Sequence, residues 1–368
     1  MEFLDLTTQQ KRIRKSLEKR INKILDHGAY IMGPEVFELE EKLADYCGVK
    51  HAISCSSGTD ALLIPLMAWG IGPGDAVFTT PFTYVATAEV ISILGATPIF
   101  VDVYESTYNI DCEKLEIEII KVVNEGKLKP KAIIPVDLFG LPARYRLIDK
   151  IAQRYNLKVI EDAAQSFGAS IGEKRVGTFG DVAATSFYPA KPLGCYGDGG
   201  AIFTNDDSLA EECKAIRIHG TSSDKYNSEV IGLNGRLDSI QAAVLLEKLK
   251  IFDEELDMRN KVNDYYREYL NNAQYIPKNY HSANALFSIT LGSHKKREEL
   301  VDRLMQNNIP NVIYYKYPIH LMKGFAYLRY KKGSFPVSEN LSKTIISLPM
   351  HPYLSKEEIN KIVQSLLK

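Results

Sequence analysis

Between residue 51 and about residue 218 the chain alternates short apolar runs with stretches whose apolar residues recur at helical spacing. The apolar runs predict strands at 51–55, 76–79, 97–101, 131–136, 157–160, 182–187 and 201–204. The stretches between them predict helices at 59–69, 84–94, 146–155 and 208–218. Strands that alternate with helices form mainly parallel sheets covered by helices on both faces. The sequence therefore predicts an α/β fold.

The segments on either side of this alternating block have a different pattern. Two helices are expected before it, at 8–27 and at about 35–46. After it, an apolar stripe from Leu237 to Phe252 predicts one long helix, which we extend toward Tyr265. The remainder is expected to form a smaller α+β unit with strands at 285–291 and 311–315. We therefore expect a large domain at 1–250 and a small C-terminal domain at 251–368.

Composition excludes several classes of protein. The 368 residues include 45 Lys and Arg against 46 Asp and Glu, so no overall charge favours nucleic acid or an anionic membrane. No signal peptide precedes the first helix, and no apolar run reaches membrane-spanning length. The five cysteines show neither paired nor metal-type spacing, which favours free thiols in a reducing compartment. We expect a cytoplasmic protein that binds no metal, nucleic acid or membrane.

Lys191 is the first residue that indicates chemistry. It follows a run at 183–187 that is too apolar for a surface loop, and it precedes Pro192 and a glycine cluster at 197–200. Glycines there let the backbone turn tightly beside a bound ring. A desolvated lysine with a lowered pKa is suited to forming an imine with pyridoxal phosphate. The alternatives are a solvent-exposed lysine in a plain loop and, for Ser186, a half-buried strand hydroxyl in place of a phosphate contact.

Asp162 and Gln165 follow the strand expected at 157–160. A carboxylate beside a pyridine nitrogen keeps that nitrogen protonated, because a nearby opposite charge favours the charged form. The protonated ring is then a strong electron sink. An alternative of equal weight is a helix-capping pair, in which Asp162 caps and Gln165 reaches back.

Two further segments lie where a parallel sheet binds ligands. In 56–60, the turn containing Gly58 and Thr59 begins a helix, whose free N–H groups suit a phosphate. An ordinary helix N-cap explains the same residues. In 81–87, Tyr84 could stack on a flat cofactor, although a place in the core is the commoner role for any single aromatic residue.

Taken together, these residues resemble the DegT-type nucleotide-sugar aminotransferases, a branch of the fold-type I pyridoxal phosphate enzymes. The similarity runs along nearly the whole chain, through 30–35, 57–61, 81–87, 161–168, 186–191, 197–200, 217–220 and 234–236. Each motif alone is modest, whereas their order and spacing are specific. The resemblance implies a fold-type I transferase with a mainly parallel central sheet and a smaller C-terminal α+β domain.

The resemblance also implies a role for each matching residue. Lys191 would hold pyridoxal 5′-phosphate as an imine and move the proton during amino transfer. The other implied cofactor contacts are Asp162 to the pyridine nitrogen, Gln165 to the ring hydroxyl, Gly58, Thr59 and Ser186 to the phosphate, and Tyr84 stacked on the ring. Asn234 matches a position that reaches the phosphate from a partner subunit. The family pattern therefore implies a homodimer with shared active sites.

The implied substrates are an amino-acid donor, glutamate by family analogy, and a keto nucleotide sugar. Tyr30, Arg236 and His320 match substrate-binding positions. Arg236 could bind a carboxylate or phosphate of the substrate, and an ordinary ion pair within the protein is about as common a role. For His320, a lone histidine is more often structural. The motifs most resemble those of enzymes that aminate UDP-linked 3-keto sugars for surface polysaccharides, with the 3-keto derivative of UDP-N-acetylglucosaminuronate as the leading substrate. A sugar dehydratase or a noncatalytic regulator on the same scaffold are the alternatives, and Lys191 favours transamination.

Overall fold

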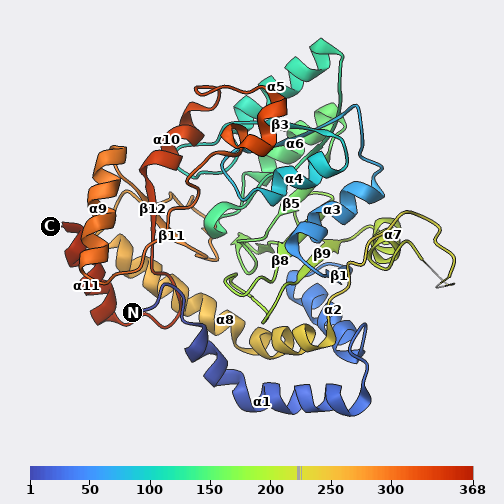
Figure 1. The fold of residues 1–368 in the computed structure, drawn as a ribbon, viewed down its shortest axis with the longest axis horizontal. Coiled ribbons are helices and arrows are strands. Elements are labelled where there is room, and N and C mark those ends of the chain that lie inside the picture. The colour runs from blue at the N-terminus through green and yellow to red at the C-terminus, as the bar shows by residue number, and fades with distance from the viewer. Residues whose placement is uncertain (222–223, 225, 368) are drawn as a thin grey trace.

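The computed structural model of the chain describes residues 1–221, 224 and 226–367, and its main feature is a large twisted sheet (Figure 1). Within these residues the sheet has seven strands in the order β1-β9-β8-β5-β4-β2-β3. The strands are β1 (His51–Cys55), β2 (Asp75–Thr79), β3 (Thr97–Phe100), β4 (Lys129–Ile133), β5 (Lys158–Asp162), β8 (Val182–Ser186) and β9 (Gly200–Thr204). Only β9 runs antiparallel to its neighbours. The expected mainly parallel α/β sheet is confirmed.

Helices cover both faces of this sheet because successive strand residues point to opposite sides. On β8, Val182 and Ala184 pack into one core, whereas Ala183 packs into another. The first core is covered by α3 (Gly58–Ala68), α4 (Ala86–Ile93) and α7 (Asp207–Arg217). The opposite face is covered by α1 (Leu6–His27), α2 (Pro34–Cys47), α5 (Cys112–Glu125), α6 (Tyr145–Tyr155) and the first half of α8 (Ser239–Arg267).

Helix α5 was not among the expected helices, although its ends carry strong signals. The Asp111 carboxylate caps its start by accepting hydrogen bonds from the backbone N–H of Glu113 (3.0 Å) and Lys114 (3.2 Å). Gly126 ends it in a left-handed conformation with φ 65°, which glycine adopts without steric cost. Between them Leu115, Ile119 and Val122 form the buried stripe.

A smaller C-terminal unit lies at one side of the molecule, together with both chain ends (Figure 1). It contains an antiparallel pair, β11 (Phe287–Thr290) and β12 (Ile345–Leu348), packed against α9 (His294–Gln306), α11 (Lys356–Leu367) and the end of α8. The expected α+β unit is confirmed. The strand expected at 311–315 is wrong, because Val312 makes only an isolated bridge to Ser347 and β12 occupies the place beside β11.

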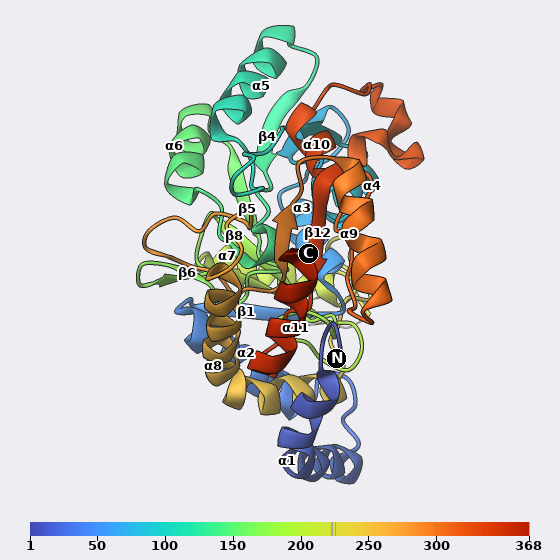
Figure 2. The ribbon, with the colours of Figure 1, turned by 90° about the vertical axis from the view of Figure 1, so that its left-hand side faces the viewer.

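Helix α8 connects the two cores (Figure 2). Its residues up to Phe252 pack in the core of the large sheet, whereas Val262 and Tyr266 pack in the C-terminal core. This agrees with a domain boundary near residue 250, which stays a prediction. The C-terminal segment also returns to the large sheet, since Phe325 and Phe335 surround Phe100 of β3. That return brings residues 314–320 to the edge of the candidate site.

The remaining described elements are short, and the other expected strands and helices are present with ends shifted by a few residues. The strand expected at 131–136 is β4, and the helix expected from 84 begins at Ala86. The short elements are η1 (Leu138–Gly140), β6 (Ser170–Ile171), β7 (Lys174–Arg175), β10 (Tyr280–His281), η2 (Ile319–Leu321), η3 (Lys323–Leu328) and α10 (Pro336–Thr344). Of the helices described here, none combines the length and the apolar character needed to cross a membrane.

Candidate active site

The candidate site lies at the carboxyl ends of the parallel strands, where open α/β sheets bind ligands. Asp162 is the last residue of β5, Ser186 is the last of β8, and Gly58 begins α3 soon after β1. A Cβ atom at Gly58 would lie 2.6 Å from the Cβ of Ser186. Only glycine allows the start of α3 to approach β8 this closely.

The start of α3 is a helix N-terminus with unused donors. The Ser57 side chain accepts the backbone N–H of Asp60 (3.0 Å), and the Ser57 carbonyl accepts that of Ala61 (3.0 Å). Ser57 is therefore the N-cap that the sequence offered as an alternative. The backbone N–H groups of Gly58 and Thr59 have no acceptor among the described residues. Together with the positive end of the helix dipole, they form a cradle that fits a phosphate.

Lys191 lies in the turn that follows β8, closed by a hydrogen bond from its backbone N–H to the Tyr188 carbonyl (2.8 Å). The residue is half-buried, and its position between β8 and Asp162 removes part of the water around its amine. Burial lowers the Lys191 pKa, and the nearby Asp162 carboxylate opposes that shift. Across the described residues, the amine has no hydrogen-bond or ion-pair partner. Lys191 thus has the partly desolvated, unengaged amine that imine formation requires.

Asp162 is 3% exposed. Its carboxylate accepts hydrogen bonds from the Thr87 hydroxyl (2.8 Å) and the Ala164 backbone N–H (3.2 Å). Burial raises its pKa, while these two bonds and the charge of Lys191 lower it. The residues after Asp162 form turns rather than a helix, so the capping interpretation of Asp162 and Gln165 is wrong. Asp162 is a buried carboxylate with neutral donors, which leaves it able to hold a cation.

Gln165 is buried and held from both sides. Its Oε1 accepts the backbone N–H of Phe139 (2.8 Å), and its Nε2 donates to the hydroxyl of Tyr315 (2.9 Å). Tyr315 also packs edge-on against Phe82, with ring centroids 6.0 Å apart. Tyr315 and Thr87 are site residues that were not predicted from the sequence. Thr87 could have been predicted, because it lies in the 81–87 motif, three residues after Tyr84. Tyr315 lies in no such motif.

Tyr84 and Phe82 differ in their exposure to solvent. Phe82 is fully buried and packs edge-on against Phe139, so it belongs to the core. The Tyr84 side chain is 59% exposed and lies close enough to influence the pKa of Tyr315. Of these two aromatics, Tyr84 is the one free to cover a flat ligand; its stacking role stays a prediction.

Asn234, Arg236 and Tyr30 lie outside this cluster. The Gly235 carbonyl accepts the Ser56 backbone N–H (2.9 Å), which fixes the 234–236 turn beside the start of α3. Arg236 donates to the Asn234 side chain. The carbonyl of Tyr30 accepts the Ser239 backbone N–H (2.9 Å). No recorded contact joins Asn234, Arg236 or Tyr30 to Lys191, so their roles stay predictions.

His320 is buried rather than open to the site. Its Nε2 lies 3.1 Å from the Glu339 carboxylate, and its ring meets Phe335 edge-on. Burial lowers the His320 pKa, and Glu339 opposes that shift. The neighbouring Ile319 backbone N–H donates to the Pro81 carbonyl (2.8 Å), which ties this segment to the loop before Tyr84. The contact with Glu339 fits a structural histidine, and its predicted role near a sugar is untested.

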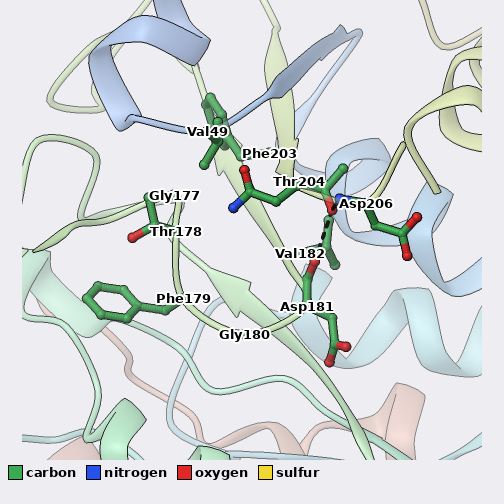
Figure 3. A pocket seen from close by; sticks show the side chains of 11 residues that line it. Val49, Gly177, Thr178, Phe179, Gly180, Asp181, Val182, Phe203, Thr204 and Asp206 are labelled. Atoms are coloured by element: carbon green, nitrogen blue, oxygen red, sulfur yellow. Dashed lines mark hydrogen bonds between the residues drawn. The ribbon is translucent and has the colours of Figure 1, made fainter. Parts of the chain in front are cut away.

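A surface depression of about 390 Å³ lies elsewhere (Figure 3). It is lined by Val49 and by residues 177–182 and 203–206. Val182 begins β8, whereas Ser186 ends it, so the depression is at the opposite end of the strand from the candidate site. A hydrogen bond from the Thr204 hydroxyl to the Asp181 carbonyl (3.1 Å) joins two of its lining residues.

The donor set fits pyridoxal phosphate. The free N–H groups of Gly58 and Thr59 suit the phosphate, the unpaired amine of Lys191 suits the aldehyde, and the buried Asp162 suits a protonated ring nitrogen. These features follow from geometry in this chain alone.

Comparisons with known proteins agree with this fit. UDP-2-acetamido-2-deoxy-3-oxo-D-glucuronate aminotransferase of Pseudomonas aeruginosa is 45% identical, over 100% of this chain and 99% of its own. A DegT DnrJ EryC1 StrS aminotransferase from Brucella abortus superposes with a TM-score of 0.96 at 50% identity, covering 100% of this chain and 98% of that one. DesV of S. venezuelae, solved in complex with a ketimine intermediate, superposes with a TM-score of 0.93 at 34% identity, covering 99% and 97%. Residues 11–367 match the DegT/DnrJ/EryC1/StrS aminotransferase family. The chain is therefore a pyridoxal-phosphate-dependent member of the DegT/DnrJ/EryC1/StrS aminotransferase family.

Proposed function

We propose that the enzyme transfers an amino group from glutamate to the keto group of a UDP-linked 3-keto sugar. The leading substrate is UDP-2-acetamido-3-keto-glucuronate, and the amino sugar would serve surface polysaccharide synthesis. The similarity to the Pseudomonas aeruginosa enzyme, which spans both chains almost completely, supports this choice.

The observation that carries the proposal is the environment of Lys191. Its amine is partly desolvated, lacks a hydrogen-bond or ion-pair partner among the described residues, and lies close enough to the Asp162 carboxylate to be influenced by its charge. Burying an unpaired charge is costly. The more deeply buried Lys248 offsets that cost with its amine 4.4 Å from the centroid of the Tyr196 ring, whereas the Lys191 amine has no such contact among the described residues. A lysine that alternates between holding a cofactor and moving a proton needs this combination. Its presence also favours amino transfer over dehydration.

Bound pyridoxal phosphate would supply an electron sink that stabilises negative charge on the substrate carbon. Lys191 would take the proton from the donor carbon and return one to the sugar carbon, with its lowered pKa keeping part of the amine neutral. Asp162 would hold the ring nitrogen protonated. Gly58, Thr59 and Ser186 would fix the phosphate end, and Gln165 and Tyr84 would orient the ring.

Arg236 is the proposed anchor for a substrate carboxylate. Its Nε is buried and has no hydrogen-bond partner in the described part of the chain. A guanidinium binds a carboxylate through two parallel hydrogen bonds, so the sugar acid and the amino-acid donor both suit it. Tyr30 is proposed to border the sugar, and so is the segment that holds His320, since that histidine is itself buried against Glu339.

A homodimer in the cytoplasm is proposed, with Asn234 of each subunit completing the phosphate site of the other. The exposure of Asn234 supports this, because an exposed side chain is open to contact with another subunit. Apolar side chains exposed nearby, including Tyr30, Ile31 and Ile231, also suit a contact between copies.

The test is a panel of keto nucleotide sugars that differ in nucleotide, in the keto carbon and in the presence of a ring carboxylate. Each is incubated with the cofactor-loaded enzyme, with and without glutamate, and the products are identified by mass spectrometry. We expect a glutamate-dependent amino sugar from the UDP-linked 3-keto uronate and none with Lys191→Ala. Lys42→Ala, at an exposed position, is the control. Turnover without glutamate would indicate dehydration, and amination by Lys191→Ala at the wild-type rate would contradict the mechanism.

A further inference from the structure

Two buried carboxyl groups belong to residues that adjoin Asp162, and the proposed chemistry does not use them. Glu161 precedes Asp162 on β5 and therefore points to the opposite face of the sheet. Asp137 lies beside the end of β5, where its backbone N–H donates to the Asp162 carbonyl (3.1 Å). Both side chains are fully buried, each 0% exposed. Two such groups in one buried region need an explanation.

Asp137 is surrounded by hydrogen-bond donors. Its Oδ1 accepts the backbone N–H of Ala143 (2.8 Å) and the hydroxyl of Tyr145 (2.8 Å). Its Oδ2 accepts the hydroxyl of Ser166 (2.9 Å). Three donors stabilise the ionised form of a carboxyl group. Burial raises the Asp137 pKa to about 7, and these three donors oppose that shift. Of the two carboxyl groups, Asp137 is therefore the one that ionises first.

The contacts of Glu161 favour its protonated form. Its Oε2 accepts the backbone N–H groups of Gly177 (3.0 Å) and Phe179 (3.1 Å), in the loop that lines the depression in Figure 3. Its Oε1 is buried and receives no hydrogen bond from a donor in the described chain. The Asp137 carboxyl lies within hydrogen-bonding reach of Glu161. A proton on Oε1 would satisfy both groups at once.

The basic side chains nearest the pair act on its neighbours, Arg175 on Cys47 and Arg144 on Tyr280. Tyr145 on α6 and Asp162 on β5 face Asp137, and Tyr280 on β10 and Cys47 on α2 lie near the pair. Over the described residues, neither Asp137 nor Glu161 forms an ion pair with a basic side chain. Two adjacent carboxylates without a cation cannot both ionise. Burial first and then Asp137 raise the Glu161 pKa well above its ordinary value.

We propose that Asp137 and Glu161 share one proton, held by Glu161, and that the single negative charge left on Asp137 supports the cation held by Asp162. The second half of this proposal rests on the assignment of Asp162 to the cofactor nitrogen. Asp137 acts through Asp162 and is a positioning residue. Its charge makes the region around Asp162 more negative, so a proton on the neighbouring ring nitrogen is held more firmly.

The shared proton is tested on the cofactor-free protein through the pH dependence of unfolding. Unfolded Glu161 loses its proton near pH ~4.3, whereas folded Glu161 keeps it. Above that pH, Glu161 gives the folded state one more bound proton than the unfolded state. This difference alone lowers the folding constant of the wild type about tenfold per pH unit. Glu161→Gln keeps an N–H donor toward Asp137 and cannot titrate. We expect its folding constant, divided by that of the wild type, to rise about tenfold per pH unit.

Glu41→Gln, at an exposed position on α2, is the matched control and should follow the wild-type profile. A Glu161→Gln profile parallel to that of the wild type would overturn the shared proton. This measurement involves neither cofactor nor sugar. An enzyme that aminates no sugar would contradict the proposed function and leave this result unchanged.

The effect on the cofactor site is tested by the absorbance of the bound cofactor as a function of pH. Asp137→Asn removes the negative charge, which makes the protonated, cationic form of the bound cofactor less stable. The pH midpoint of the absorbance change should therefore fall by about one pH unit. Glu161→Gln keeps the charge on Asp137 and should leave the midpoint in place. Ser166→Ala, which removes one donor from Asp137, should lower the midpoint less and serves if Asp137→Asn does not fold. An unchanged midpoint in a folded variant of Asp137 or Ser166 would overturn the role of Asp137.

Discussion

A hydrogen bond of 2.9 Å joins the Nε2 of Gln165 to the hydroxyl of Tyr315, across 150 residues of sequence. Gln165 follows β5 of the large sheet, whereas Tyr315 belongs to the C-terminal segment that returns to it. The bond orients the Gln165 amide, because Oε1 is already used by Phe139. The C-terminal segment thus contributes to the candidate site by fixing a side chain of the large sheet.

Tyr315→Phe removes this acceptor and leaves a buried amide donor unpaired. Such a loss costs about 1–3 kcal/mol, so we expect a lower free energy of unfolding in urea. Cofactor affinity should fall by roughly tenfold, measured by titration of the cofactor-free enzyme. Tyr275→Phe, at a half-exposed side chain, is the control. Equal behaviour of the two variants would show that the bond does not hold Gln165 in place.

Thr87→Val tests how Asp162 is kept ionised. Burial raises the Asp162 pKa, and the Thr87 hydroxyl is the largest factor that lowers it. Valine has nearly the same shape without the hydroxyl, so the pKa should rise further. The acid limb of the kcat/KM profile should therefore move to higher pH, by about one unit. Thr178→Val, at the distant depression, is the control, and an acid limb that does not move would contradict the prediction.

Gly58→Ala tests the close approach of α3 to β8. The new Cβ would lie 2.6 Å from the Cβ of Ser186, and such overpacking costs about 1–3 kcal/mol. We expect lower thermal stability and weaker cofactor binding, because the free N–H groups would move away from the strand. Gly324→Ala, with no atom within 4 Å of its new Cβ, should change neither. The double variant Gly58→Ala/Ser186→Gly should recover part of the lost thermal stability but not the cofactor binding, because the Ser186 hydroxyl is also gone. Thermal stability that does not recover would contradict a clash between these two residues.

The sheet and the large-domain part of the site were predictable because their signals are local. The run that forms β8 is apolar at consecutive positions, and Lys191 follows it within a few residues. The closeness of Gly58, Asp162 and Ser186 followed from one topological rule, that parallel strands end at the same edge. The same local reasoning should have found α5, whose cap at Asp111 and terminal Gly126 are visible in the sequence.

The C-terminal contribution was not predictable in this way. The segment at 311–315 has a strand-like sequence, but β12 (Ile345–Leu348) pairs with β11 and leaves it as a loop. That competition depends on long-range packing rather than on local preference. The hydrogen bond of Tyr315 follows from the same packing. The pairing of His320 with Glu339 is also a tertiary contact.

The last prediction concerns the shared active site proposed for a homodimer. Lys191→Ala should be inactive in every site of its own dimer, and Asn234→Asp should weaken its partner's site by placing a carboxylate against the phosphate. If Asn234 acts across the interface, a mixed dimer of the two variants has one site with both changes and one site with neither. Random exchange of subunits should then restore about a quarter of wild-type activity.

The measurement mixes the two purified variants, verifies mixed dimers by native mass spectrometry and follows amino-sugar formation with time. Gly324→Ala mixed with Lys191→Ala supplies the reference for simple dilution, since Gly324 lies in open space. Should each subunit use its own Asn234, every site in the mixed dimer would carry one defect, and activity would stay at the sum of the separate variants. Recovery above that sum requires that the two residues of one working site come from different chains.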